Sequence, residues 1–232
     1  MKLKVLGTRG EIKQSAPSHH WHSGTIIDNL LLDLGESDFL KFNPESVFIT
    51  HLHRDHAFFV SGQPLSTNIP VYAPEIFNQA HAVIPLNAMV QYNDHQITPI
   101  PTRHSKLVKS QAYLVDYGKN KLLYTGDLIW IDKEYHHLLE GLDLVITDGS
   151  YFRQGGLVRK DKNTGLLFGH NGIPDLVNLF GHFTNNILFV HFGSWFFEDI
   201  GESKHKIKAL AKNVSLNLYV GYDGMELDLK DL

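Results

Sequence analysis

Three histidines and one aspartate occupy alternate or adjacent places in the short stretch H-x-H-x-D-H at positions 51–56. This stretch directly follows the apolar run 47–50, which predicts a buried strand that ends where the polar residues begin. Alternate side chains of an extended segment point the same way, so His51 and His53 share one side and Asp55 continues the row. His56 adjoins Asp55 and diverges from it. Imidazole nitrogens and carboxylate oxygens bind zinc, iron(II) and manganese, so the pattern predicts a metal site.

The composition is that of an ordinary globular domain with an unusual supply of histidine. The chain has 232 residues, with 43% hydrophobic and 20% charged residues, and 15 histidines. Neither repeats nor linker-like segments divide it, so we expect one domain over residues 1–232. Cysteine is absent, which excludes disulfides and thiolate ligands and leaves nitrogen and oxygen to bind any metal.

The charge and the hydropathy pattern bear on the binding partners and the cellular location of the protein. The net charge of −4 indicates no broad basic surface, although a local basic patch would be enough to bind nucleic acid. The longest apolar runs fall short of the ~18 residues that a membrane-spanning helix needs. The apolar run at the N-terminus is also too short for a secretory signal. We therefore expect a soluble cytoplasmic protein without membrane partners.

Further metal-ligand residue types follow other predicted strands. His104, Asp127, Asp148 and His191 each come at or just after the end of an apolar run. Many short strands with helices between them favour an α/β layered domain, in which ligands bind where strand ends and loops converge. Convergence would supply enough ligands for two metals.

In that arrangement one metal is held by His51, His53 and His104, the other by Asp55, His56 and His191, and Asp127 bridges them. Two metals about 3.5–4 Å apart clamp a substrate oxygen and lower the pKa of a bridging water, which then attacks as hydroxide. Asp55 could also accept a proton from that water, or act as a ligand alone. Asp148 is expected to hydrogen-bond to a ligand histidine.

The ordered motifs resemble those of the metallo-β-lactamase superfamily of binuclear metallohydrolases. The resemblance rests on H-x-H-x-D-H, a later histidine after Thr-Arg, then Tyr-Thr-Gly-Asp and Phe-Val-His-Phe, and it covers essentially the whole chain. Leu30 to Gly35 looks like the second hairpin of that family, and Asp223-Gly224-Met225 like a frequent C-terminal signature. The resemblance implies a four-layer αβ/βα sandwich, the ligand assignment above, two divalent ions (zinc first, with manganese or iron as alternatives) and a possible homodimer.

Within the superfamily, His104-Ser105 and Gly169-His170 look most like the ribonuclease Z and phosphodiesterase branch. There, a histidine in the place of His170 helps to handle the phosphate or the leaving group; a structural alternative is that His170 caps the loop before the next helix. The chain departs from the branch because it lacks a long substrate-clamping arm and has Asn171 where Ser or Thr is usual. These departures argue against a tRNA substrate but not against phosphoester hydrolysis.

The resemblance therefore favours a hydrolase that uses a metal-bridging hydroxide on a phosphodiester: RNA, DNA or a cyclic nucleotide-like molecule. The same ligand set serves thioester and lactone hydrolases, and a third alternative is a non-catalytic, metal-stabilised binding or sensor module. Basic side chains in nearby loops would attract an anionic substrate, although solvated lysines are the default interpretation: Lys106, Lys109, Arg153, Arg159, Lys160 and Lys162.

Four local predictions remain. Pro74 and Glu75 start a helix that runs to about Val83 and contains His81. Residues 152–169 form a loop or an insertion. Asp33 interrupts an apolar run and either caps a turn or contacts the metal loop. The aromatic run 195–197 is expected to belong to the core.

Overall fold

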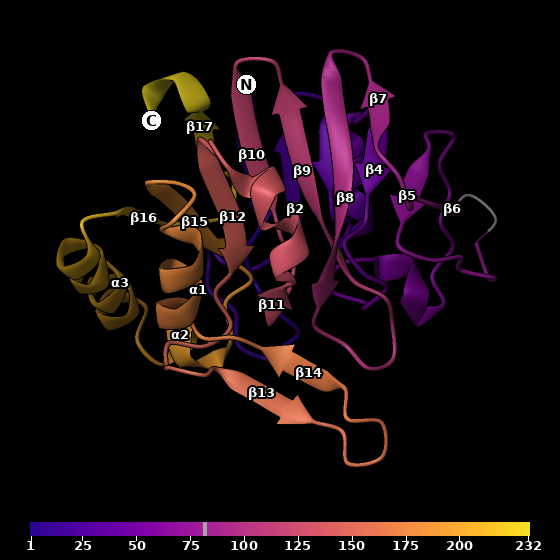
Figure 1. Cartoon of the computed structure of the whole chain (residues 1–232). Helices are drawn as coiled ribbons and strands as arrows, with labels where there is room; N and C mark the ends of the chain where they lie inside the picture. The colour runs from indigo at the N-terminus through magenta and orange to yellow at the C-terminus, as the bar shows by residue number, and fades with distance from the viewer. Residues whose placement is uncertain (81–82) are drawn as a thin grey trace.

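Two β-sheets packed face to face form the centre of the computed structural model, which describes residues 1–80 and 83–232 (Figure 1). The first sheet has the order β17-β1-β2-β3-β4-β5-β6. Its strands are β1 (Lys2–Gly7), β2 (Gly24–Ile27), β3 (Leu30–Leu32), β4 (Ser46–Phe48), β5 (Val71–Ala73), β6 (Val83–Pro85) and β17 (Glu226–Asp228).

The second sheet has the order β11-β8-β9-β10-β12-β15-β16, and β7 pairs with β8. Its strands are β7 (Val90–Tyr92), β8 (His95–Arg103), β9 (Gln111–Tyr117), β10 (Asn120–Tyr124), β11 (Trp130–Ile131), β12 (Leu144–Asp148), β15 (Asn186–Val190) and β16 (Asn217–Val220). Strands β10, β12, β15 and β16 run parallel. Their carboxyl ends therefore meet at one edge, which is where ligands bind in such sheets.

Helices cover the outer faces. Three α-helices lie against the second sheet: α1 (Ile173–Phe180), α2 (Ser194–Glu198) and α3 (Ile200–Val214). The other helical segments are short 3₁₀ helices: η1 (Ser37–Phe42), η2 (Phe58–Ser61), η3 (Lys133–Leu139) and η4 (Leu229–Asp231). No helix in the described residues is both long enough and apolar enough to cross a membrane.

Strand alternation explains the layers. In β3, Leu30 and Leu32 face the second sheet, while Leu31 faces outward to a separate apolar cluster that includes residues of η1 and η2. In β4, Phe48 and Val47 divide between the same two clusters. Both faces of these strands are buried, which is why they read as continuous apolar runs. The predicted α/β sandwich is confirmed.

The predicted helix after Pro74 is wrong. Residues 74–80 are irregular, and Val83 begins β6, which pairs in parallel with β5 through Val71. Helical propensity is a weak prior, and here burying Val83 beside β5 outweighs it. His81, predicted to lie in that helix, falls outside the described residues.

The segment 152–169 is more ordered than a loop. Strands β13 (Leu157–Lys160) and β14 (Leu167–His170) pair antiparallel and project from the body of the molecule (Figure 1). Asp161 closes the turn, because its Oδ1 accepts the backbone N–H groups of Asn163 and Thr164 at 2.9 and 3.0 Å. The lysine and glycine content suggested a loop, but the strands alternate too weakly for the sequence to show them.

Candidate metal centre

All seven predicted metal ligands converge at one edge of the two sheets. The motif at 51–56 follows β4, His104 follows β8, Asp127 follows β10 and His191 follows β15. Strand β4 ends at Phe48, slightly earlier than predicted, because the chain then turns toward β9, where the Thr50 carbonyl accepts the Gln111 N–H at 3.0 Å. The loops thus bring side chains from both sheets to one place.

One group of possible ligands consists of His51, His53, His104 and Asp127, whose ligand atoms all lie within 4.8 Å of one another. His53 Nδ1 lies 3.0 Å from His51 Nε2 and 3.3 Å from His104 Nε2. Asp127 Oδ2 is 3.5 Å from His104 Nε2 and 3.7 Å from His51 Nε2. Three imidazole nitrogens and a carboxylate oxygen therefore face one point, which suits a tetrahedral zinc site.

A second group consists of Asp55, His56 and His191. Asp55 Oδ2 lies 2.9 Å from His191 Nε2 and 3.8 Å from His56 Nε2. Asp127 Oδ1 is 3.2 Å from His56 Nε2 and is a buried oxygen without a hydrogen-bond partner in the described residues. Asp127 thus directs one oxygen to each group. This is the arrangement that the bridging role requires.

A third group joins Asp127 and His191 to Asp148 and His170. His170 Nδ1 lies 2.6 Å from Asp148 Oδ2, and His191 Nδ1 lies 3.4 Å from Asp148 Oδ1. Asp148 Oδ1 also accepts the backbone N–H of Ser150 at 2.8 Å. The expected contact between Asp148 and a ligand histidine is present. Because these oxygens are already engaged by N–H groups, orientation suits Asp148 better than metal binding.

Asp33 holds the second group from inside the core. Its carboxylate is fully buried and accepts hydrogen bonds from Thr50 N at 2.7 Å, Tyr124 Oη at 3.0 Å and His56 Nδ1 at 2.7 Å. The last bond leaves His56 Nε2 free to face Asp55 and Asp127. Asp33 contacts the metal loop, so the second of its two interpretations is correct. The signal in the sequence was a single carboxylate inside an apolar run.

The electrostatics of the two groups differ. Burial lowers the pKa of His104 to about 4 and the pKa of His51 well below its ordinary value, so both are neutral and ready to bind a cation. Burial also opposes a charge on His56, but Asp127 and Asp33 outweigh it and raise the pKa of His56 to about 10. The carboxylates therefore attract positive charge to the second group. Divalent ions would balance the carboxylates and take the free imidazole nitrogens, so the donor set fits metal ions.

Buried charged neighbours also shift the pKa values of Asp55 and His170. Burial raises the pKa of Asp55, but the neighbouring His56 and the hydrogen bond from His191 bring it below its usual range. Burial lowers the pKa of His170, but the charges of Asp148 and Asp127 raise it above its ordinary value. The site thus joins a carboxyl with a lowered pKa, Asp55, to an imidazole with a raised pKa, His170.

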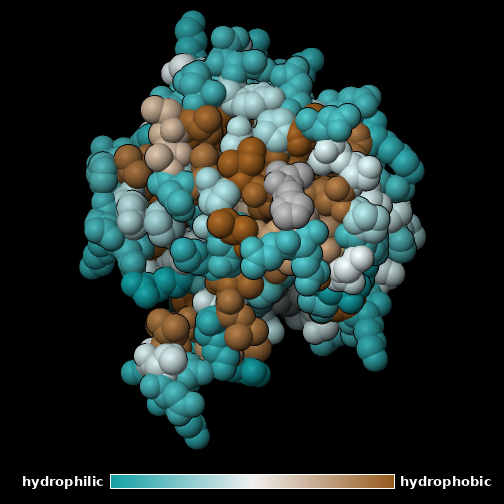
Figure 2. Space-filling model, turned by 90° about the vertical axis from the view of Figure 1, so that its right-hand side faces the viewer, coloured by the Kyte–Doolittle hydropathy of each residue, from teal (hydrophilic) through white to brown (hydrophobic). Residues whose placement is uncertain are grey.

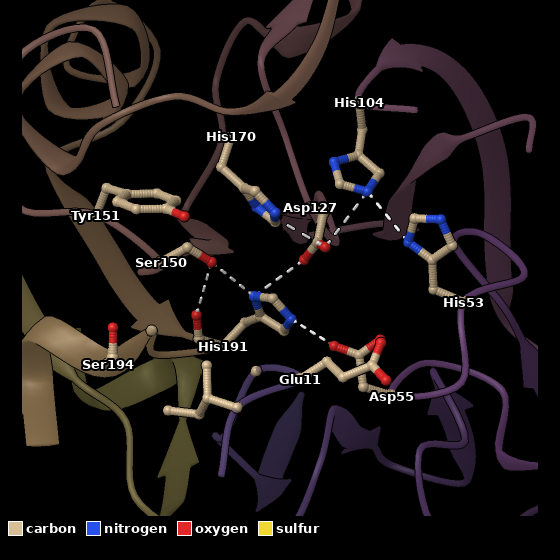
Figure 3. A pocket seen from close by; sticks show the side chains of 13 residues that line it. Glu11, His53, Asp55, His104, Asp127, Ser150, Tyr151, His170, His191 and Ser194 are labelled. Atoms are coloured by element: carbon tan, nitrogen blue, oxygen red, sulfur yellow. Dashed lines mark hydrogen bonds and ion pairs between the residues drawn. The ribbon is translucent and has the colours of Figure 1, made fainter. Parts of the chain in front are cut away.

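A cavity of about 210 Å³ opens beside these groups (Figure 3). His53, Asp55, His104, Asp127, His170 and His191 line it, whereas His51 and His56 lie behind them and are fully buried. Seven further residues that the sequence did not indicate line the cavity, and four of them bring polar side chains: Glu11, Ser150, Tyr151 and Ser194. Glu11 brings a carboxylate to the cavity, and partial desolvation there, with the nearby Asp55, raises its pKa.

The aromatic run at 195–197 lies where the sequence predicted it. Phe196 is fully buried, and Trp195 and Phe197 pack against the same core cluster, so the aromatic run belongs to the core. His19 is also buried, where its ring packs edge-on against Phe196. Neither group lines the cavity.

Comparisons with known proteins identify the fold through solved structures. No family model matches the sequence, and no curated protein matches it either. A solved structure, the metallo-β-lactamase fold protein YhfI from Bacillus subtilis, superposes with a TM-score of 0.69 at 18% identity, over 97% of this chain and 98% of that one.

The chain has the metallo-β-lactamase fold. Human tRNase Z, short form, is similar over 99% of both chains, with a TM-score of 0.63 and 17% identity. A diphosphatase from the PhnP family has a TM-score of 0.63 and 16% identity, over 98% of this chain and 97% of that one. An isothiocyanate hydrolase from Delia radicum gut bacteria has a TM-score of 0.62 and 14% identity, over 98% of both chains. The family resemblance seen in the motifs is thus confirmed as a shared fold.

Proposed function

We propose that the protein is a metal-dependent hydrolase that cleaves a phosphodiester at this centre. The observation that carries the proposal is Asp127, whose two carboxylate oxygens face two separate ligand groups at the floor of one cavity. The motif order of the phosphodiesterase branch supports the choice of substrate. Two structural neighbours, a tRNase Z and a diphosphatase, act on phosphate esters or anhydrides by their names.

The residues divide between the ions as follows. His51, His53 and His104 would hold one ion, and Asp55, His56 and His191 the other, with Asp127 shared. Zinc fits this nitrogen-rich set best, with manganese or iron(II) as alternatives. When bound, such a pair supplies Lewis-acid activation of the substrate and of a water nucleophile.

The side chains of the protein position the substrate and handle the protons. Asp55 accepts the proton that the attacking water releases, because its carboxylate lies at the cavity wall. His170 donates its Nε2 proton to the leaving oxygen. Its Nδ1 is bound to Asp148 Oδ2 at 2.6 Å, which turns the other nitrogen outward and stabilises the charged ring before transfer.

A second candidate function is hydrolysis of a neutral thioester or lactone. Glu11 favours it, because a carboxylate at the cavity disfavours a second anion there. Arg54 reduces that charge through an ion pair of 3.5 Å between exposed side chains. The fold also serves an isothiocyanate hydrolase, which by its name acts on an uncharged substrate.

One experiment separates these functions. The purified protein is loaded with zinc or manganese and assayed on bis-p-nitrophenyl phosphate, a thioester and a lactone. We expect diester turnover. Thioester or lactone turnover without diester turnover would contradict the leading proposal, and two bound metals without any turnover would favour a binding or sensor module. Extension of the diester assay to RNA and DNA tests the nucleic-acid partner, and mass measurement in solution tests the homodimer.

A further inference from the structure

Among the described residues, the projecting hairpin β13–β14 hydrogen-bonds to one predicted metal ligand, His104, and its last residue, His170, lies 3.8 Å from Asp127. The backbone N–H of Gly169 donates to the His104 carbonyl at 2.7 Å, and His104 Nδ1–H donates to the Gly169 carbonyl at 2.9 Å. Both the main chain and the ring of His104 are therefore fixed by one residue of the hairpin. The second bond leaves Nε2 as the metal-binding nitrogen, 3.3 Å from His53 Nδ1.

Gly169 makes this contact possible because no other residue fits its position. Its φ is +116°, a conformation that side-chain-bearing residues rarely adopt. A Cβ atom there would also collide with the backbone carbonyl of Leu157 on the facing strand. The next residue, His170, turns its ring toward the ring of His104, with 4.8 Å between centroids. One backbone kink thus places two functional side chains.

An ion pair joins the turn of the hairpin to the loop that carries His104. Lys106 lies two residues after His104, and its Nζ is 2.8 Å from Asp161 Oδ2 in the hairpin turn. The same Nζ lies 4.8 Å from the ring centroid of Phe168 in β14. Asp161 is itself held by the backbone of the turn, so the ion pair joins two ordered segments. Figure 1 shows the hairpin and the β8–β9 loop at the same end of the molecule.

We propose that Gly169 and Lys106 are positioning residues that act through His104, so that the hairpin sets the zinc affinity of one of the two metal positions. The hairpin carries His170 as well, so docking it completes the metal group and presents the leaving-group histidine in one step. Since an outer hydrogen bond of this kind changes metal affinity by about tenfold to hundredfold, the effect is measurable on a single site. The inference rests on the metal-binding part of the proposed function.

The test is a competitive zinc titration of metal-free protein against a chromophoric chelator, which gives two separate dissociation constants. Gly169→Ala should weaken one zinc equivalent by about tenfold or more and leave the other unchanged. With cobalt(II) as probe, only one of the two sets of visible absorption bands should shift. Gly165→Ala is the matched control, because Gly165 also has a positive φ of 73° in this hairpin but lies close only to the Lys160 side chain.

A second pair of variants keeps the test decisive if Gly169→Ala does not fold. Lys106→Met should weaken the same zinc equivalent by a smaller factor, and Lys106→Arg should restore it. Lys109→Met serves as the control, because Lys109 lies in the same loop and makes no ion pair among the described residues.

Two results would overturn the inference. The first is unchanged zinc dissociation constants in folded Gly169→Ala or, if that variant does not fold, in Lys106→Met. The second is equal weakening of both zinc equivalents. A wild-type protein that binds fewer than two zinc ions would instead contradict the metal centre itself, so the two failures are distinguishable.

Discussion

The two halves of the metal centre are anchored in different ways. In the second group, His56 is oriented by Asp33, a fully buried carboxylate within the first sheet. In the first group, His104 is oriented by Gly169, a backbone carbonyl on a projecting hairpin. Core carboxylates are held by tight packing on every side, whereas a hairpin is held only by its few contacts with the body. One half should therefore be rigid, and the other should depend on how the hairpin docks.

Asp127→Ala should disrupt both metal-binding groups at once, because Asp127 is the only predicted ligand that they share. We expect loss of metal stoichiometry as well as of activity, measured by elemental analysis of protein loaded with excess zinc. Asp132→Ala is a suitable control, since its exposed side chain pairs with Arg103 away from the cavity. Two full zinc equivalents in Asp127→Ala would contradict the bridging role.

Asp33→Asn should damage the second group alone. The amide cannot accept all the bonds that the carboxylate accepts from Thr50, Tyr124 and His56, so His56 loses its fixed orientation. We expect about a tenfold to hundredfold loss of affinity for one zinc equivalent and a lower melting temperature.

Asp28→Asn is the control for that variant. Asp28 and Asp33 both have a positive φ, 51° and 59°, but Asp28 lies exposed at a turn. Comparing Asp33→Asn with Gly169→Ala shows whether the two substitutions weaken different equivalents. If both weaken the same one, the division into two separately anchored halves is wrong.

His170→Ala should leave both zinc equivalents in place and lower only the catalytic rate. Loss of a general acid typically costs about a hundredfold to ten-thousandfold, and the loss should be smaller for a diester with a good leaving group such as nitrophenolate. Rates on a nitrophenyl diester and on an alkyl diester, with zinc content measured in parallel, check this. Loss of zinc would make His170 a ligand, and unchanged rates on both substrates would make it structural.

Acid should destabilise the fold through His19, a buried histidine outside both groups. Burial lowers the pKa of His19 to about 4, so the folded protein resists a proton that the unfolded chain accepts near pH 6.5. This contribution is present above pH 6.5 and is lost as the pH falls toward 4, at most about 3 kcal/mol of unfolding free energy.

Denaturant unfolding of metal-free protein between pH 7 and 4.5 measures the effect, with His19→Asn compared with the wild type. The variant should show a shallower decline with acid. An identical decline in both proteins would show that His19 does not contribute, and that acid acts through the metal-binding histidines instead.

The sequence predicted the ligands that belong to recognisable motifs. The motif at 51–56 carries its own spacing, and His104, Asp127 and His191 follow it in the order of a familiar pattern, so their convergence was foreseeable. The α/β layers followed from many short apolar strands with helices between them, and the four-layer sandwich from the family resemblance.

The rest of the site depends on contacts between distant segments. Asp33 acts on His56 across the pairing of β3 with β4, and Gly169 acts on His104 across the hairpin, neither of which a spacing rule can show. Glu11 lies at the cavity because its neighbour Gly10 donates its backbone N–H at 3.1 Å to the carbonyl of Phe192, the residue after His191. The wrong helix after Pro74 has the same origin, since pairing of β5 with β6 outweighs local propensity.

A zinc titration of metal-free protein with bis-p-nitrophenyl phosphate present tests the central claim most directly, because it follows binding and hydrolysis together. Two ions at one shared carboxylate should bind as two equivalents, and diester hydrolysis should rise steeply only as the second position fills. Saturation at a single equivalent, or two bound equivalents with no diester hydrolysis, would contradict a two-metal phosphodiesterase centre.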